Sequence, residues 1–344
     1  MEKKKVIHIH TDLKFISDAR RFEGEQFDNH HIVIADSGNW STLQESYGSE
    51  ISLFEYSRKS LGRVIQLCKE YDLVIFYDLD NIKCKLALEL PGSIKKAWRF
   101  FGYEIYSREP DLYYSQLTKE SVRTGLVQWF KTLINKKSTA LKSLIMWGYT
   151  PSSLFSEAIK RIDYFLSFSL EEYEYLKKRW ANLPTFVRLS VDESYLTEKQ
   201  ANQIRNGSVI IGNNKSRYNN NLDVIRLIET TGNPFRYQFY LLSNYGTESD
   251  YSRKVAETIK DKEDYTIIND FMEADKFNDI YKCVSAAIFN GYRQMALGNV
   301  FTALKYGVKL YLNNHNTVMH WLLDNHIKIS SVNDMSADLR GGNL

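Results

Sequence analysis

The segment from 286 to 314 combines the residue types that are best suited to bind an anion. Its letters, AAIFNGYRQMALGNVFTALKYGVKLYLNN, indicate a short strand, a polar loop, a helix that begins at Gly298 and Asn299, and a second strand. The free N–H groups of a helix's first turn and the positive end of its dipole attract anions. Arg293, just upstream, can hold phosphate oxygens in a fork. We therefore expect a diphosphate site at Arg293, Gly298 and Asn299, with an ordinary strand-helix-strand crossover as the alternative.

A second polar loop follows the apolar strand SVIIG, which ends at Gly212. A glycine at the carboxyl end of a strand, followed by hydrogen-bond donors and cations, suits a phosphate-bearing ligand in the crevice of an α/β sheet. The loop carries neither the GxGxxG pattern of NAD-binding domains nor the GxxxxGK[ST] pattern of P-loops. Its candidate ligand-binding residues are Gly212, Asn213, Asn214, Lys215 and Arg217.

Two carboxylates are candidates for a general base. Glu104 follows a predicted strand, and Asp12 follows the strand VIHIH beside His10. A carboxylate within hydrogen-bond reach of a hydroxyl group can take its proton. The alternatives are that Glu104 pairs with a neighbouring arginine to hold its loop, and that His10 is a strand-end histidine with satisfied hydrogen bonds.

The motif Asp78-Leu79-Asp80 offers a different chemistry. It follows the apolar strand LVIFY and has the D-x-D form that holds a divalent metal on a nucleotide diphosphate in GT-A glycosyltransferases. Paired carboxylates at a strand end can coordinate Mg²⁺ or Mn²⁺. The nucleotide-type loops lie in the other half of the chain, so we expect no metal and keep this motif as the alternative.

The elements that must position these residues alternate between strand and helix along the whole chain. This alternation predicts parallel sheets with helices on both faces, that is, an α/β fold with two doubly wound halves. The predicted strands are Val6 to His10, Ile32 to Ala35, Ile51 to Tyr56, Leu73 to Tyr77, Ala97 to Phe101, Tyr164 to Phe168, SVIIG (208–212), RYQFYLLS (236–243), YTIIN (265–269), AAIFN (286–290) and KLYLN (309–313).

The length of 344 residues also favours two domains. The polar stretch from 191 to 207 is the predicted boundary, so the expected domains are 1–190 and 191–344. Two Rossmann-like domains that face a central cleft are the architecture of GT-B glycosyltransferases. Such a fold does not by itself establish an activity.

Composition excludes several classes of protein. Hydrophobic residues make up 43% of the chain, and the 45 basic and 42 acidic residues nearly cancel to a net charge of +3, so a nucleic-acid binder is not expected. The N-terminus runs directly into a strand without a signal-like apolar region, which predicts a cytoplasmic protein. Three cysteines far apart in apolar stretches predict buried free thiols: Cys68, Cys84 and Cys283.

The charges are unevenly distributed between 121 and 150, where no acidic residue occurs. Apolar residues in this stretch follow a largely helical spacing, and Trp129 and Trp147 are among them. A basic amphipathic helix can lie on an anionic membrane surface, which predicts peripheral association with the inner face of the cell membrane. The alternative is a surface helix whose solvated face happens to be basic. The basic residues are Arg123, Lys131, Lys136, Lys137 and Lys142.

Three segments together resemble one known family. VIIGNNKSRYNNNLDVIRLI supplies Gly212, Asn213, Arg217 and Asn219. FNDIYKCVSAAIFNGYRQMALGNVFTALKYGVKLYLNN supplies Arg293, Gln294, Gly298, Gly307 and Asn313. IKKAWRFFGYEIYS supplies Trp98, Phe101, Gly102, Glu104 and Tyr106. In this order they resemble the 4-acetamido-4,6-dideoxygalactose (Fuc4NAc) transferases of enterobacterial common antigen synthesis, glycosyltransferase family 56.

The resemblance implies an inverting GT-B enzyme that moves a deoxyamino sugar from a dTDP donor to a saccharide on undecaprenyl diphosphate. It implies that Glu104 is the base, and it places Trp98 and Gly102 in a matching motif. We expect His10, Trp98, Gly102 and Tyr103 to bind the acceptor, and Tyr292 or Tyr218 to stack on thymine. No cofactor is implied. Asn214-Lys215-Ser216 and Tyr77-Asp78-Leu79 depart from the family's pattern, so the resemblance leaves the two sugars open.

Two other classes of function are alternatives. A sugar-nucleotide epimerase or dehydrogenase needs a glycine-rich loop after its first strand, and the segment IHIHTDLKF has none. A non-catalytic protein of the GT-B type could hold a nucleotide sugar with the same loops, so this alternative stays open.

Overall fold

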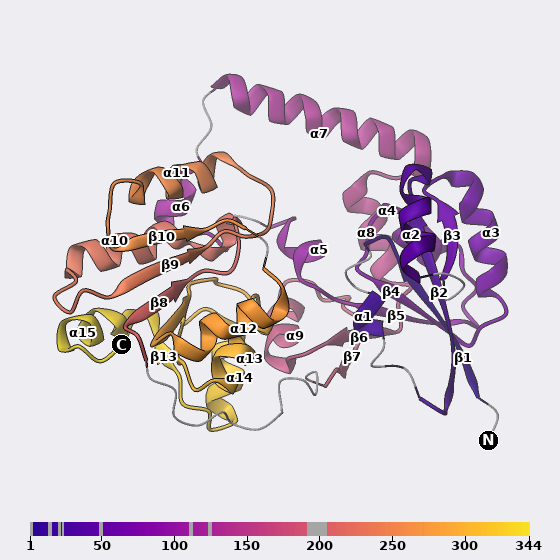
Figure 1. The fold of residues 1–344 in the computed structure, drawn as a ribbon. Helices are drawn as coiled ribbons and strands as arrows, with labels where there is room; N and C mark the ends of the chain where they lie inside the picture. The colour runs from indigo at the N-terminus through magenta and orange to yellow at the C-terminus, as the bar shows by residue number, and fades with distance from the viewer. Residues whose placement is uncertain are drawn as a thin grey trace. The chain divides into compact units, whose positions relative to one another are not determined.

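A computed structural model describes residues 3–12, 16–19, 22, 24–47, 51–109, 113–122, 126–190, 205–270 and 272–344. The chain forms two compact units. The first comprises Met1–Ile105 and Gly125–Ser190, and the second comprises Tyr106–Thr124 and Val191–Leu344. Each unit is built on its own parallel sheet (Figure 1).

The sheet of the first unit has seven strands in the order β3-β2-β1-β4-β5-β6-β7, and all neighbours are parallel. Its middle strand β4, LVIFY, is apolar throughout, as is typical of a parallel strand covered on both faces. The strands are β1 Lys4–His10, β2 Phe27–Ala35, β3 Ile51–Glu55, β4 Leu73–Tyr77, β5 Lys95–Arg99, β6 Tyr164–Ser167 and β7 Thr185–Arg188.

Helices of the first unit begin at side chains that accept from the free N–H groups of the first turn. Ser57 caps α3, Asp80 caps α4, and Thr150 caps α8. The helices are α1 Ile16–Ala19, the 3-10 turn η3 Ser37–Asn39, α2 Trp40–Tyr47, α3 Arg58–Cys68, α4 Asn81–Glu89, α5 Tyr103–Tyr106, α7 Leu126–Trp147, α8 Pro151–Ile159 and α9 Leu170–Lys177. The last residue of α5 already belongs to the second unit.

The sheet of the second unit has six parallel strands in the order β10-β9-β8-β11-β12-β13. The strands are β8 Ser208–Ile211, β9 Gln238–Leu242, β10 Tyr265–Ile268, β11 Ala286–Phe289, β12 Lys309–Leu312 and β13 Ser330–Ser331. The helical segments are α6 Gln116–Ser121, η7 Arg217–Asn219, α10 Asn221–Thr231, α11 Asp250–Ile259, α12 Ala274–Cys283, α13 Leu297–Lys305, α14 Thr317–Asp324, η8 Val332–Asp334 and α15 Met335–Gly341.

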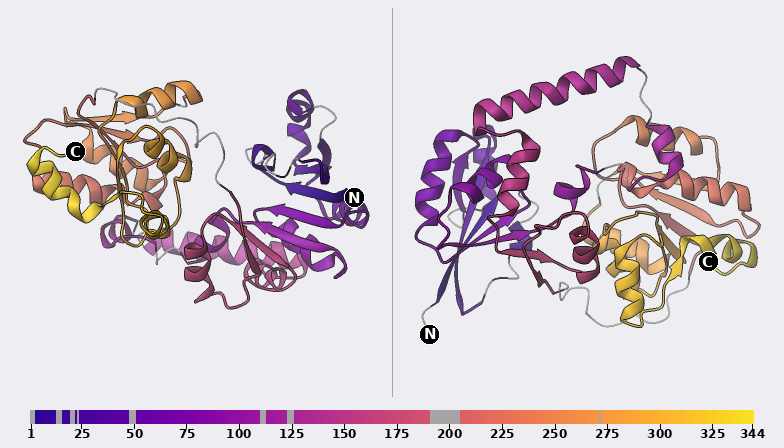
Figure 2. Two further views of the ribbon diagram at one scale, coloured as in Figure 1. Left: turned by 90° about the horizontal axis from the view of Figure 1, so that it is seen from below. Right: turned by 180° about the vertical axis from the view of Figure 1, so that it is seen from behind.

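Two hydrophobic cores cover the two faces of this second sheet. Because side chains alternate along a strand, Val209 and Ile211 of β8 face one core while Ile210 faces the other. Helices α10, α11 and α15 close the first core, and α12, α13 and α14 close the second. Figure 2 shows these helices on opposite sides of the sheet. The predicted fold class, two doubly wound α/β domains, is confirmed.

Both sheets reverse their strand order at one point. In the first unit the reversal lies between β1 and β4, and in the second it lies between β8 and β11. The loops after such neighbouring strands run to opposite faces and leave a crevice at their carboxyl ends, where α/β domains bind ligands. The loops after β8 and β11, which carry most of the residues predicted to bind the donor, therefore follow the two strands at the reversal point of the second sheet.

The predicted strands are all present, with small shifts at their ends. Strand β2 begins at Phe27 rather than at Ile32. The sequence analysis missed this first half of the strand because it is mostly polar and at least partly exposed. The two strands that the sequence analysis missed, β7 and β13, are short and lie at sheet edges; β7 is mostly exposed, and β13 consists of two serines. Cys68 and Cys84 are buried, but Cys283 is exposed at the end of α12, so its predicted burial was wrong.

One segment of the second unit is inserted, in sequence, between the two parts of the first unit. This inserted segment, Tyr106–Thr124, carries α6. Helix α6 lies beside α10 and α11 (Figure 1). The predicted boundary at 191 falls outside the described residues.

Helix α7 is 22 residues long. No helix in the described part of the chain combines the length and the apolar character needed to cross a membrane.

Candidate functional site

The loop after β8 begins at a position that only glycine suits. Gly212 has a φ of +65°, and a Cβ atom there would lie 2.6 Å from Oδ1 of Asn221. Asn214 then turns the chain, because its Oδ1 accepts hydrogen bonds from the Ser216 N–H at 2.8 Å and from Nδ2 of Asn219 at 2.8 Å. Lys215 and Arg217 are thus held on a loop with a defined conformation.

Asn220 ties this loop to the loop after β11. It is fully buried and has a left-handed backbone with a φ of +48°. Its Nδ2 donates to the carbonyl of Asn290 at 3.2 Å, and Nδ2 of Asn290 donates back to the carbonyl of Asn220 at 3.2 Å. The two loops predicted from the sequence to bind a diphosphate are therefore joined by reciprocal hydrogen bonds.

The loop after β11 places Arg293 against aromatic rings. Its guanidinium carbon lies 4.7 Å from the ring centre of Tyr218, which belongs to the loop after β8. The Nε atom of Arg293 and Oε1 of Gln294 are buried and have no hydrogen-bond partner among the described residues. Polar atoms in this state can be satisfied by a bound ligand or by water.

Helix α13 starts without a side-chain cap. Its first residue is preceded by Ala296, whose φ is +59° and whose side chain cannot accept a hydrogen bond. The first N–H groups, including that of Gly298, are thus not capped by the preceding side chain. The side chain of Asn299 is already used, because its Oδ1 accepts from the Tyr281 hydroxyl at 2.9 Å. Any contact of Asn299 with an anion would therefore be made by its backbone N–H.

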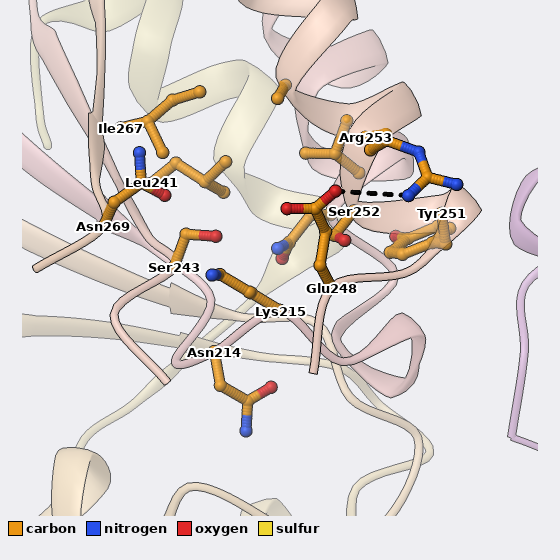
Figure 3. A pocket seen from close by; sticks show the side chains of 13 residues that line it. Asn214, Lys215, Leu241, Ser243, Glu248, Tyr251, Ser252, Arg253, Ile267 and Asn269 are labelled. Atoms are coloured by element: carbon orange, nitrogen blue, oxygen red, sulfur yellow. Dashed lines mark hydrogen bonds and ion pairs between the residues drawn. The ribbon is translucent and has the colours of Figure 1, made fainter. Parts of the chain in front are cut away.

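A cavity of about 200 Å³ lies beside Lys215, at the carboxyl ends of β8, β9 and β10 (Figure 3). Leu241 and Ile267 form apolar parts of its wall, and Ser243 and Asn269 add hydrogen-bonding groups. It is closed on another side by α11. Neither Tyr292 nor Tyr218 lines it; the ring of Tyr292 lies 4.9 Å from that of His315 instead.

In the first unit, Glu104 is a buried carboxyl held in place by Trp98. The side chain of Glu104 is 3% exposed, and its Oε1 accepts from the indole N–H of Trp98 at 3.0 Å. Burial, with a smaller effect from the charge of Asp78, raises the pKa of Glu104 to about 7. Trp98 itself is fully buried among Phe100, Phe155 and Phe165, so it positions Glu104 rather than facing solvent.

The other residues predicted around the acceptor differ widely in exposure. Gly102 has a φ of +99°, which lets the chain turn from β5 into α5, and the side chain of Tyr103 is exposed. His10 is fully buried, and its ring stacks on Tyr77 at 4.2 Å. Burial and neighbouring histidines lower the pKa of His10 to about 2, so this ring is neutral at physiological pH. Asp12 lies at the carboxyl end of β1 and is half-buried.

The D-x-D motif is occupied by a lysine of its own chain. The fully buried ammonium of Lys83 forms an ion pair with Asp78, lies 3.5 Å from Oδ2 of Asp80, and donates to the Tyr77 carbonyl at 2.6 Å and to Oγ1 of Thr11 at 2.8 Å. The ammonium takes the place between the carboxylates that a divalent cation would need. The described residues contain no group of three or more histidine, cysteine, aspartate or glutamate side chains that could hold a metal.

Sequence reasoning missed three residues that organise these sites: Lys83, Asn220 and Tyr106. Lys83 lies on the apolar face of a helical pattern and carried no signal beyond its charge. Asn220 stands in a run of three asparagines, where only its left-handed backbone distinguishes it. Tyr106 appeared only as a position that matches a family motif.

Comparisons with known proteins agree with this fold. No family model matches the chain, and no curated protein matches it by sequence. Among solved structures, it is similar to Anabaena HepE in complex with UDP and glucose, with a TM-score of 0.61 and 11% identity over 98% of this chain and 89% of that one. Sucrose-phosphate synthase from Thermosynechococcus elongatus gives a TM-score of 0.59 and 9% identity over 98% and 89%.

The pneumococcal O-GlcNAc transferase GtfA in complex with UDP and GlcNAc is also similar, with a TM-score of 0.58 and 9% identity over 100% of this chain and 91% of that one. At such identities the likeness shows the fold, which is that of the GT-B glycosyltransferases with two Rossmann-like domains. The resemblance to Fuc4NAc transferases is not tested by these structures and stays a prediction.

Proposed function

We propose that this protein is an inverting, metal-independent GT-B glycosyltransferase that moves a sugar from a nucleoside diphosphate to a lipid-linked saccharide. The observation that carries the proposal is the pair of loops after β8 and β11, which meet at the point where the strand order reverses. Crevices at such points are the usual ligand sites of doubly wound domains. Several of the solved structures of similar fold are in complex with UDP or UDP-glucose, which agrees with this choice of ligand.

The donor's diphosphate would lie between Lys215, Arg293 and the first turn of α13. A leaving nucleoside diphosphate gains negative charge as the glycosidic bond breaks, and fixed cations and backbone N–H groups stabilise that charge without reorganising. The unpartnered Nε of Arg293 and the uncapped start of α13 are groups of this kind. Gly212, Asn213 and Asn214 would let the phosphates approach the backbone.

The cavity beside Lys215 is the proposed place for the nucleobase. Its volume of about 200 Å³ is below that of a site for a whole drug-sized ligand, and its apolar and hydrogen-bonding walls suit a planar heterocycle. Lys215 lines this cavity and also lies on the loop after β8. A nucleobase in the cavity and a phosphate on that loop could therefore belong to one nucleotide. The choice of dTDP rests on the resemblance to Fuc4NAc transferases.

Glu104 is the proposed base that takes the proton of the acceptor hydroxyl. A pKa of about 7 keeps a substantial fraction of the carboxylate ionised at neutral pH and makes it a better base than an ordinary glutamate. Trp98 would hold Oε1 in place, and Gly102, Tyr103 and His10 are proposed to shape the acceptor site. Asp12 is the second candidate for the base.

Helix α7 is the proposed contact with the membrane that carries the acceptor. Its exposed apolar side chains include Ile134 at 63% and Ile145 at 73%. At about 100° per residue, five of them fall on one arc of about 120°, with Lys137 inside the arc and Lys136 and Lys142 each about 60° outside it; the five are Leu133, Ile134, Leu141, Leu144 and Ile145. An apolar stripe among lysines without any acidic residue fits the surface of an anionic bilayer.

Replacing Ile145 by Glu is expected to weaken binding to vesicles rich in anionic phospholipid by about tenfold or more, because it removes an apolar side chain that would enter the bilayer and adds a charge that the anionic lipids repel. Co-sedimentation with anionic and with zwitterionic vesicles measures this. Leu323→Glu on α14 is the matched control, since Leu323 is also an exposed apolar residue on a helix. Equal binding of both variants would remove α7 from the proposal.

The donor proposal is tested by a thermal-shift panel of dTDP, UDP, GDP and CMP. A nucleotide at a hundred times its Kd should stabilise the protein by about 2.7 kcal/mol, or roughly 5 °C or more in Tm for a protein of this size. If no nucleotide raises Tm, the donor site is not where we place it.

Turnover is tested with the sugar ester of the nucleotide that binds. Release of free nucleoside diphosphate should require a lipid-linked saccharide and should be unchanged by EDTA, because Lys83 already neutralises the D-x-D motif. Loss of activity with EDTA would favour the metal reading of Asp78 and Asp80. Binding without turnover over a broad panel of acceptors would favour a non-catalytic protein.

A further inference from the structure

Two tyrosines of the inserted segment Tyr106–Thr124 contact the two arginines of the proposed donor site: Tyr106 contacts Arg293, and Tyr114 contacts Arg217. The guanidinium carbon of Arg293 lies 4.8 Å from the ring centre of Tyr106 and 4.7 Å from that of Tyr218. The ring of Tyr218 is 5.0 Å from that of Tyr114, and the guanidinium carbon of Arg217 is 5.1 Å from the ring of Tyr114. All five side chains belong to the second unit.

We propose that Tyr106 and Tyr114 are positioning residues of the donor site, which orient Arg293 and Arg217 for the diphosphate. The proposal rests on the donor site proposed above and extends it to a segment that the sequence places more than 100 residues upstream. Neither tyrosine need touch the ligand, because each acts through the arginine that lies on its ring.

Contact with two aromatic rings restricts how Arg293 can bind. The guanidinium carbon lies over the ring of Tyr106 and over that of Tyr218, so both rings limit the orientations that the guanidinium can adopt. A guanidinium is planar and carries N–H groups that form parallel bonds to two oxygens. We expect Tyr106 and Tyr218 to hold Arg293 for a bidentate contact of the kind that a diphosphate can accept, and to reduce the rotamer freedom that Arg293 would lose on binding.

Hydrogen bonds fix the inserted segment to the loops that it serves. Oδ1 of Asn220 accepts from the backbone N–H of Ser115 at 2.9 Å, and its Nδ2 donates to the carbonyl of Tyr113 at 3.3 Å. The hydroxyl of Ser115 donates to Asp223 of α10 at 2.5 Å, and the Tyr218 hydroxyl donates to the carbonyl of Tyr106 at 3.3 Å. Asn220 thus joins three segments, because it also bonds Asn290 in the loop after β11.

The ring of Tyr106 is itself held firmly. It is fully buried, and the ring of Tyr113 packs edge-on against it at 4.4 Å. A buried ring with fixed neighbours gives a guanidinium a rigid surface, which an exposed tyrosine would not. This difference separates a positioning role from incidental contact.

Tyr106→Leu is expected to raise the Kd of the nucleoside diphosphate about tenfold, because the cation-π contact and the stacked surface are lost. Tyr106→Phe keeps the ring and should restore the Kd to within about twofold. The pair Tyr114→Leu and Tyr114→Phe should behave in the same way through Arg217, which provides a second test if Tyr106→Leu does not fold. Isothermal titration calorimetry with the nucleotide of highest affinity, and Tm without nucleotide, are the measurements.

A double-mutant cycle shows whether Tyr106 acts through Arg293. In an Arg293→Ala background, Tyr106→Leu should have no further effect on Kd, because the side chain that it orients is gone. A merely structural role of Tyr106 would lower Tm and raise Kd by the same factor in both backgrounds. That additive result would overturn the inference.

The outcomes separate this inference from the proposed function. If the wild-type protein binds none of the nucleotides, the donor site fails and the inference fails with it. If the wild-type protein binds a nucleoside diphosphate and the Leu and Phe variants bind equally well, the donor site stands and the positioning role is refuted. If only the Leu variants lose affinity, and only while the arginine is present, both stand.

Discussion

Replacing Glu104 by Gln should lower kcat by about 10²- to 10⁴-fold, the usual contribution of a general base, while leaving the Kd of the nucleoside diphosphate unchanged. The amide of Gln keeps an oxygen for the indole N–H of Trp98 and nearly the same volume, so the packing around the site survives. It cannot take a proton from the acceptor hydroxyl. Steady-state rates together with nucleotide binding by calorimetry separate the two effects.

The pH dependence of the wild-type rate gives a second reading of the same residue. The base must be ionised, so kcat/KM should rise with pH through about 7, the pKa of Glu104. Trp98→Phe removes a hydrogen bond that favours the ionised form, so the rise should move to higher pH. Normal turnover of Glu104→Gln would show that the base is elsewhere, and Asp12→Asn would then be the next variant to measure.

Stability should follow the opposite course with pH. The pKa of Glu104 is raised in the folded protein from 4.5 to about 7, so the folded state binds this proton more tightly than the unfolded state. Its contribution to stability is complete below pH 4.5 and is lost as pH rises through about 7, which amounts to about 3 kcal/mol. Glu104→Gln does not titrate, so its stability relative to the wild type should increase between pH 5 and pH 8. Equal pH profiles of Tm would contradict the raised pKa.

Replacing Arg293 by Ala should lower kcat/KM about 10²- to 10³-fold, because the leaving diphosphate loses a fixed cation. The Kd of the nucleoside diphosphate should rise about 10- to 100-fold, the range expected when hydrogen bonds to a charged group are lost. Calorimetry and initial rates at varied donor concentration measure both effects.

Two variants make the Arg293 result specific. Arg293→Lys should recover little, since an ammonium is a point charge that can neither reproduce the contact of a planar guanidinium with the rings of Tyr106 and Tyr218 nor bind two oxygens in parallel. Arg226→Ala is the matched control, because Arg226 is an exposed arginine on α10 and its removal changes the net charge equally. If Arg226→Ala weakens binding as much as Arg293→Ala, general electrostatic attraction rather than a specific contact holds the donor.

Much of the fold could be predicted because its signals are local. The apolar run LVIFY, the glycine after SVIIG and the helix after Arg293 are each contained in a few neighbouring residues, and the structure has each element in place. Short, exposed edge strands such as β7 lack such a signal, since their pairing comes from the neighbouring strand and not from their own side chains.

The candidate site was predictable only as a set of loops. Parallel strands place their carboxyl ends along one edge of a sheet, so the order of elements already brought Lys215 and Arg293 into one region. How their side chains are held was not predictable. Arg293 contacts Tyr106, which precedes it by 187 residues in the sequence. A local sequence pattern cannot predict a contact over such a separation.

The amino-acid sequence by itself therefore determined the two doubly wound domains, the loops available for an anion and the carboxylates available for proton transfer, because periodicity, turn residues and charge act over short stretches of chain. Only the tertiary structure decided the protonation and partners of these groups. Burial raises the pKa of Glu104, Lys83 fills the space between Asp78 and Asp80, and Asn220 joins three segments. Desolvation and hydrogen-bond pairing depend on which distant residues surround a group, and folding alone brings those residues together.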